Sequence, residues 1–267
     1  LPTRRQRQMC IRDRYYRLAQ AVSFSNSFIK NASELSGDEV NVFIAEARFL
    51  RAYAYYNLLD LYGNVPLTTE ISTDLPTQSN RTELFNFIES ELMEIESTLL
   101  ASNEYGRVDN VAAHALLSRL YLNAEAWTGQ DRYADCITYS QNVINSGYTL
   151  NMNDANGNGT AYDELFMADN DVNGAQNEFI FTLNFDGMQS QTYGGTTFLV
   201  HAAIGGSMNP GNFGVNGGWG GLRTTKNLVN QFAVDLDALN SSLGSQSDWG
   251  LVAVSYTHLR AHETKKH

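Results

Sequence analysis

Cysteine, basic residues and long apolar runs are all scarce in this sequence of 267 residues. The only two cysteines are Cys10 and Cys136, and Cys10 lies in an unusual N-terminal stretch, so we expect no internal disulfide and a fold that relies on its core. No run of about eighteen apolar residues is present, so no segment is suited to span a membrane as a helix. With 18 basic against 29 acidic residues, the chain lacks the basic surface that nucleic-acid phosphates require, and we expect no nucleic-acid partner.

Motifs of the common catalytic and nucleotide-binding sites are also missing. The sequence has no His-x-x-x-His, no cysteine pair and no Gly-x-Ser-x-Gly, so zinc chemistry and serine-nucleophile chemistry have little support. A glycine-rich run at 205–221 lacks both G-x-G-x-x-G and the lysine of a P-loop, which disfavours nucleotide binding. We interpret His114 as a hydrogen-bonded core residue, and His201 stands alone.

The two ends differ in character from the interior. Residues 1–14 and 254–267 resemble translated sequencing-adaptor read-through at the ends of metagenomic fragments, and we interpret both as adaptor-like artefacts. Both ends are net basic, so the interior is more acidic than the whole-chain net charge of −11 suggests. This acidity suits a secreted or surface protein that handles neutral ligands, or it only aids solubility.

The strongest pattern in the chain predicts a long central helix over residues 41–62. Its apolar residues recur at steps of three and four, which places them along one stripe of a helix. The stripe contains Val40, Phe43, Ile44, Ala47, Leu50, Ala54, Leu58, Leu61 and Tyr62. We expect Gly63 to end the helix as a left-handed C-cap, and Pro66 to prevent the helix from resuming. Glu46, Arg48 and Arg51 lie on or beside the buried face, where structural ion pairs are the expected role.

Similar patterns predict a mainly α protein. Further helices are expected over residues 15–32, from 81 or 82 to 99, over 110–127 and over 131–147, with Asp131 as a cap. They would form irregular tetratricopeptide-like helical hairpins over residues 15–147. From 148 to 253 Gly, Asn, Asp and Thr become frequent, which predicts a long loop-rich segment with one or two short strands. One strand is expected at 178–185, where phenylalanines alternate with other residues, and one short helix at 224–232.

Several segments resemble the SusD/RagB family. The resemblance lies in EARFLRAY (46–53), LYGNVPL (61–67), the block GRV…AAHALLSRLYL (106–122) and NEFIF (177–181). It covers most of residues 15–232 and implies a glycan-binding lipoprotein of the outer membrane that acts without catalysis, as the lid of a TonB-dependent, SusC-like transporter. The chain would then be an internal fragment, because it carries no signal sequence and no cysteine placed for a lipid anchor.

Two other function classes remain open on the residues alone. A glycoside hydrolase needs only two suitably spaced carboxylates, and this chain has many acidic residues. An interaction scaffold of helical hairpins would instead bind peptides or proteins through a concave face.

The glycine-rich run offers candidate sugar-contacting residues. Trp219, Phe213 and the nearby Tyr193 could present their rings to the apolar faces of sugars. Three asparagines could supply hydrogen bonds to hydroxyl groups: Asn209, Asn212 and Asn216. The alternative is that Trp219 packs the loop onto the helices, because large aromatic side chains are usually buried.

Two short motifs match the first half of a calcium-binding loop. They are Asp154-x-Asn156-x-Asn158-Gly159 and Asp169-x-Asp171-x-Asn173-Gly174. In both, the twelfth position lacks the bidentate glutamate that such a loop requires, since Leu165 and Ile180 stand there. Calcium at either loop is one interpretation, and turns in which Asp and Asn bond the backbone without metal are the other.

Overall fold

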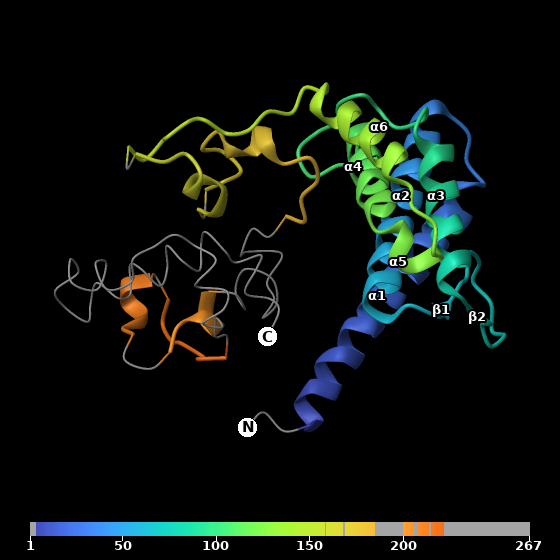
Figure 1. Cartoon of the computed structure of the whole chain (residues 1–267), viewed down its shortest axis with the longest axis horizontal. Coiled ribbons are helices and arrows are strands. Elements are labelled where there is room, and N and C mark those ends of the chain that lie inside the picture. Colours follow the sequence, from blue (N-terminus) through green and yellow to red (C-terminus); the bar gives the residue numbers. More distant parts are fainter. Residues whose placement is uncertain are drawn as a thin grey trace. The chain divides into compact units, whose positions relative to one another are not determined.

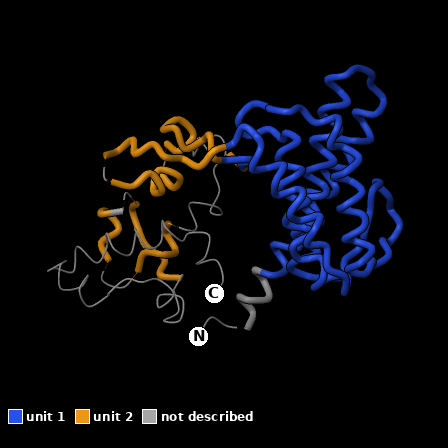
Figure 2. The backbone as a smooth tube through the Cα atoms, turned by 45° about the horizontal axis from the view of Figure 1, so that its top comes forward, with its two compact units in different colours: residues 1–148, 179–182 blue, residues 149–178, 183–267 orange. Residues whose placement is uncertain are grey.

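The computed structural model describes residues 4–157, 159–167, 169–184, 200–205, 208–213 and 215–221. The chain divides into two compact units (Figure 2). Unit 1 contains residues 1–148 and 179–182, and unit 2 contains residues 149–178 and 183–267.

Unit 1 is built from helices, which confirms the mainly α prediction. In chain order they are α1 (Arg4–Ala32), α2 (Asp38–Tyr62), α3 (Arg81–Ile95), α4 (Asn110–Leu122), α5 (Ala124–Thr128) and α6 (Tyr133–Ile144). Helix α2 packs against both α1 and α3, and α4 packs against α6 (Figure 1). Two short strands, β1 (Val65–Pro66) and β2 (Gln78–Ser79), pair antiparallel, with Val65 opposite Ser79.

The core of unit 1 surrounds α2. Ala52, Tyr55 and Leu59 of α2 are fully buried, and they lie in one cluster with apolar residues of α3 and α4. The predicted stripe was wrong at two positions, because Leu50 is 40% and Leu61 is 46% exposed. Apolar residues surround most of α2, so its periodicity alone did not determine which edge faces solvent.

The helix boundaries follow from local capping chemistry. Asn80 caps α3 through a capping box, in which its side chain accepts from the Glu83 backbone N–H while the Glu83 carboxylate accepts from the Asn80 N–H. Gly63 ends α2 as predicted, and its N–H donates to the Leu59 carbonyl, but its φ of 76° and ψ of −90° lie outside the left-handed helical conformation that the prediction gave this cap.

Several predicted boundaries differ from the structure. Helix α1 begins at Arg4 rather than at residue 15, and α3 ends at Ile95 rather than at residue 99. The predicted helix 110–127 divides into α4 and α5 at Asn123. The residue before α6 is Arg132, so Asp131 is not its cap. Propensity patterns locate such ends less well than cap geometry does.

The predicted strand at 178–185 was wrong over its described part, 178–184. Phe179–Thr182 belongs to unit 1, where the Phe181 ring packs edge-on against Phe49 at 5.4 Å and Tyr53 at 6.2 Å. A strand needs a partner for its backbone, and these residues instead contribute side chains to the α2 core. The predicted helix 224–232 lies outside the described residues.

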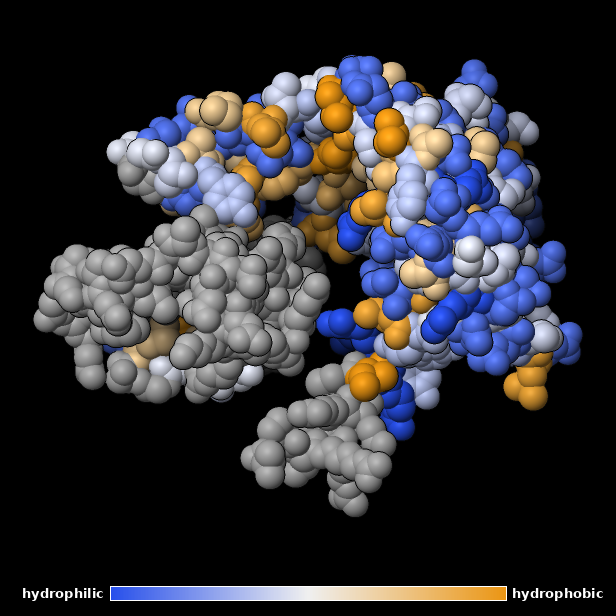
Figure 3. All heavy atoms as spheres, in the orientation of Figure 1, coloured by the Kyte–Doolittle hydropathy of each residue, from blue (hydrophilic) through white to orange (hydrophobic). Residues whose placement is uncertain are grey.

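The described part of unit 2 is rich in loops. It contains three 3₁₀ turns, η1 (Asp163–Phe166), η2 (Ala175–Glu178) and η3 (Pro210–Phe213), and a short helical turn at 200–203. Among the described residues no helix combines the length and hydropathy needed to cross a membrane. Where unit 1 is visible in Figure 3, hydrophilic residues predominate and hydrophobic ones form separate spots.

Candidate functional site

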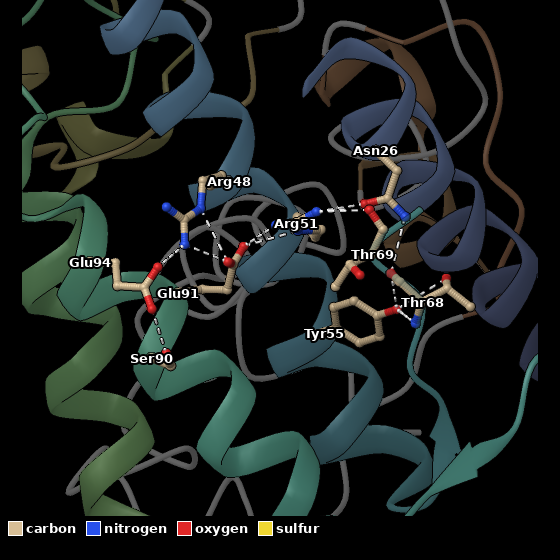
Figure 4. A network of polar contacts seen from close by, with 9 residues as sticks. All are labelled: Asn26, Arg48, Arg51, Tyr55, Thr68, Thr69, Ser90, Glu91 and Glu94. Atoms are coloured by element: carbon tan, nitrogen blue, oxygen red, sulfur yellow. Dashed lines mark hydrogen bonds and ion pairs between the residues drawn. The ribbon is translucent and has the colours of Figure 1, made fainter. Parts of the chain in front are cut away.

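A buried ion-pair network joins the first three helices (Figure 4). Arg51 of α2 donates from Nε and Nη2 to Glu91 Oε2 at 2.9 and 2.5 Å, and from Nη1 to Asn26 Oδ1 of α1 at 2.8 Å. Arg48 Nη2 donates to the other carboxylate oxygen of Glu91 at 2.6 Å. Arg51 and Glu91 are 5% and 6% exposed, so this network confirms the predicted structural role of Arg48 and Arg51.

The outer edge of this network shows how its charges stabilise one another. Partial burial opposes the charged form of Arg48, but hydrogen bonds to Glu91 and Glu94 raise the pKa of its guanidinium above the usual range. Hydrogen bonds from Arg48 and Ser90 lower the pKa of the Glu94 carboxyl. Both shifts favour the charged forms of Arg48 and Glu94, so this ion pair contributes to the scaffold.

The other predicted structural residues of unit 1 also have partners within the scaffold. Glu46 accepts a hydrogen bond from Arg107 at 2.8 Å, and His114 Nε2 lies 2.8 Å from Glu96 Oε1. His114 is thus a hydrogen-bonded residue between α3 and α4, as predicted.

In unit 2, two short segments that are distant in sequence lie side by side. The Trp219 N–H donates to the His201 carbonyl at 2.7 Å, and the Gly220 N–H donates to the Ile204 carbonyl at 2.8 Å. Gly218 permits this approach, because a Cβ there would lie 2.6 Å from the Ile204 carbonyl oxygen. Ala202 and Ile204 are buried beneath the contact.

This pairing brings the side chain of Trp219 onto that of His201. The two rings are stacked, with centroids 4.8 Å apart and planes inclined by 22°. His201 Nδ1 lies 2.8 Å from the Gly217 carbonyl oxygen; since that oxygen only accepts, Nδ1 carries the hydrogen. Trp219 is 46% exposed, so it is neither mostly exposed nor buried.

The remaining candidate sugar contacts are only partly described. Asn209, Asn212 and Asn216 are exposed, and Asn209 Oδ1 accepts from the Gly211 N–H at 3.1 Å. Phe213 belongs to η3, and Tyr193 lies outside the described residues. His201 is the residue that sequence reasoning missed, because no local pattern links it to a tryptophan eighteen positions away.

Both calcium-like loops bond to the same buried carboxylate. Glu164, which is 2% exposed, accepts from the Asn156 N–H at 2.8 Å and from Asn173 Nδ2 at 3.1 Å. Asp154 Oδ2 accepts from the Gly159 N–H at 2.8 Å, and Asn173 Oδ1 accepts from the Ala175 N–H at 2.9 Å.

The other members of the two loops add no metal cluster. Asp169 and Asp171 are exposed, and Asn158 lies outside the described residues. Over the described ranges, no group of three or more His, Cys, Asp or Glu side chains could hold a metal ion. The observed bonds are those of turns closed by Asp, Asn and Glu side chains.

The described residues thus define a class: an array of irregular helical hairpins, accompanied by loops that carry a half-exposed aromatic stack. Such a stack can bind a ring that has an apolar face. Comparison with known proteins shows which family the chain resembles. Residues 8–122 match a SusD-like family model described as starch-binding and associating with the outer membrane.

Over 226 residues the chain is 37% identical to the starch-binding protein SusD of Bacteroides thetaiotaomicron. That alignment covers 84% of this chain and 39% of the relative, so the chain spans well under half of the relative's length. Over both matched ranges the chain is similar to SusD-like proteins, in agreement with the resemblance of its motifs. The range that matches the family model begins at residue 8, within the segment 1–14 interpreted as adaptor-like.

Solved structures show the same fold. A SusD superfamily protein from Parabacteroides distasonis is 27% identical with a TM-score of 0.56, and the match covers 66% of this chain and 38% of that protein. A laminarin-binding SusD-like protein is 26% identical with a TM-score of 0.51, and the match covers 60% of this chain and 35% of that protein.

Proposed function

We propose that the protein binds glycans or oligosaccharides at the cell surface without catalysis. The observation that carries this proposal is the stack of Trp219 on His201, because it presents a half-exposed indole in a chain that matches a family model described as starch-binding. An indole face packs well against the apolar face of a sugar ring, and the exposed Asn209, Asn212 and Asn216 amides can bond its hydroxyl groups.

We further propose that the whole protein is a lipid-anchored partner of a TonB-dependent, SusC-like transporter in the outer membrane. The description of the family as associating with the outer membrane supports this location. The acidic net charge of −11 fits a surface protein that takes up uncharged nutrients rather than nucleic acid.

Calorimetric titration with soluble starch, laminarin and a xyloglucan oligosaccharide tests the binding proposal. We expect at least one of these neutral glycans to bind, and Trp219→Ala to weaken that binding by about 1–3 kcal/mol, the cost of removing a central aromatic contact. Phe24→Ala is the matched control, because Phe24 is a 66% exposed aromatic residue of unit 1, and it should leave binding unchanged.

Three results would contradict parts of this proposal. Release of reducing ends from a bound glycan would indicate a glycoside hydrolase. Unchanged affinity in a folded Trp219→Ala variant would remove Trp219 from the site, and absence of binding to all three glycans would count against glycan capture by this chain.

A further inference from the structure

The sequence contains four Asn-Gly pairs, at 156–157, 158–159, 173–174 and 216–217. This dipeptide is prone to lose the asparagine amide spontaneously, because glycine has no Cβ to shield its backbone nitrogen from the neighbouring side chain. Two of the pairs lie in the same tripeptide, Val-Asn-Gly, at 172–174 and 215–217. A difference in reactivity between these two must therefore come from the structure around them.

The structure restrains the first of these two asparagines and its glycine. Asn173 Oδ1 accepts from the Ala175 N–H at 2.9 Å, and Nδ2 donates to the carbonyl and to Oε2 of Glu164 at 3.0 and 3.1 Å. The Gly174 N–H is engaged as well, because it donates to Gln176 Oε1 at 2.8 Å. The Asn173 side chain must break several hydrogen bonds before its Cγ can reach the Gly174 nitrogen.

The second asparagine has none of these restraints. Asn216 is exposed, and within the described part of the chain no hydrogen bond or ion pair engages its side chain or the Gly217 N–H. A Cβ placed on Gly217 would meet no atom within 4 Å, so there is room for a ring to form at this position. The Asn216 side chain is thus free to rotate until its Cγ meets the Gly217 nitrogen.

We propose that Asn216 is a site of spontaneous deamidation, and that the fold protects Asn173 from the same reaction. In the first step the Gly217 nitrogen bonds to Asn216 Cγ, the Cγ–Nδ2 bond breaks, and ammonia leaves with the proton of the Gly217 N–H. Water then opens the resulting succinimide on either side of its nitrogen. Breaking the bond to Cγ gives aspartate, and breaking the original peptide bond gives isoaspartate, whose main chain runs through Cβ.

Both products change the surroundings of Trp219. Each replaces a neutral amide by a carboxylate, and isoaspartate also adds a carbon to the main chain directly before Gly217. The Gly217 carbonyl accepts the hydrogen bond from His201 Nδ1 at 2.8 Å, and His201 stacks on Trp219. The reaction therefore alters the loop that carries the indole, whatever ligand the protein binds.

The test follows both tripeptides in the full chain during incubation in a mildly alkaline buffer. Peptide mapping by mass spectrometry measures the conversion of each asparagine, and chromatography separates the aspartate and isoaspartate peptides. We expect Asn216 to convert at least about tenfold faster than Asn173 in the folded chain, because the Asn173 hydrogen bonds must open first. In urea, which removes the structure, the two asparagines should convert at similar rates.

Three variants test the structural cause. Asn216→Gln should stop conversion at this position, because glutamine would have to close a larger ring. Gln176→Ala removes the acceptor of the Gly174 N–H, so it should raise the rate at Asn173 several-fold and leave the rate at Asn216 unchanged. Gln176→Glu is the matched control, because it keeps an acceptor oxygen and should leave both rates unchanged.

Two results would overturn this proposal. Conversion of Asn173 as fast as that of Asn216 in the folded chain would show that the hydrogen bonds of Asn173 do not protect it. Conversion of Asn216 in urea but not in the folded chain would show that the fold restrains this asparagine too.

Discussion

At the scale of single residues, the most informative group is the carboxylate of Glu91. Two guanidinium groups, from Arg48 and Arg51, donate to its two oxygens, and only 8% of its side chain is exposed. Burying a charge is costly unless it is paired and hydrogen-bonded, and this carboxylate meets both conditions. It therefore ties α3 to α2, while Asn26 extends the network to α1.

We expect Glu91→Ala to lower the free energy of unfolding by about 3–5 kcal/mol, because Arg51 would remain buried without its partner. The matched control is Glu94→Ala, which also removes an ion pair with Arg48 but one whose carboxylate side chain is 59% exposed. Solvent screens that pair, so its loss should cost about 1 kcal/mol or less. Urea unfolding measures both, and similar losses in the two variants would show that burial of the Glu91 pair is not decisive.

At the scale of elements, the helices depend on local signals of different strength. Helix α3 begins with a complete capping box, whereas the residue before α6, Arg132, makes no side-chain capping hydrogen bond. Helix α4 is capped by the buried Asp109, whose second oxygen accepts from the Tyr148 hydroxyl at 2.7 Å. Burial and this hydrogen bond to Asp109 raise the pKa of the Tyr148 hydroxyl above its ordinary value.

Asn80→Ala should destabilise unit 1 by about 1 kcal/mol, because the first turn of α3 loses the side-chain acceptor for the Glu83 N–H. Asn142→Ala serves as the control, since Asn142 is an exposed asparagine within α6 and alanine has the higher helix propensity. Chemical unfolding followed by circular dichroism measures the difference. A loss in Asn142→Ala as large as in Asn80→Ala would contradict the capping role.

The elements also differ in how well the amino-acid sequence predicts them. The helical periods of α2, α3 and α4 are long enough to identify each helix. The phenylalanine alternation at 178–185 suggested a strand, but Phe181 uses its ring to cover Phe49 and Tyr53 instead. A short alternation of apolar residues does not show whether a partner strand is available.

At the scale of the whole molecule, the status of the N-terminal segment can be tested by truncation. Deletion of residues 1–14 removes the exposed hydrogen bond from the Tyr62 hydroxyl to the Ile11 carbonyl but keeps the Tyr15 ring against Tyr62. We expect a loss of about 1 kcal/mol or less, the usual net worth of such a bond, and hence a small change in Tm.

Deletion of residues 1–23 is the comparison, because it also removes Val22, which is 3% exposed, and Leu18 beside it. That truncation should destabilise unit 1 by several times more, since burial of large apolar side chains is lost. Calorimetric unfolding of both truncated chains measures these two losses of stability. A large loss from the shorter deletion would show that residues 1–14 belong to the folded protein.

By itself the sequence determined the helical class, the approximate positions of α2, α3, α4 and α6, and the similarity to SusD-like proteins, because helix periods, Gly63 and the EARFLRAY and YGNVPL motifs are local signals. Only the tertiary structure decided which edge of α2 faces solvent and where Phe181 packs. It also decided that His201 lies under Trp219, and that both Asp/Asn loops bond to Glu164. The physical reason is that these outcomes depend on contacts between segments far apart in the chain, which no local period or motif encodes.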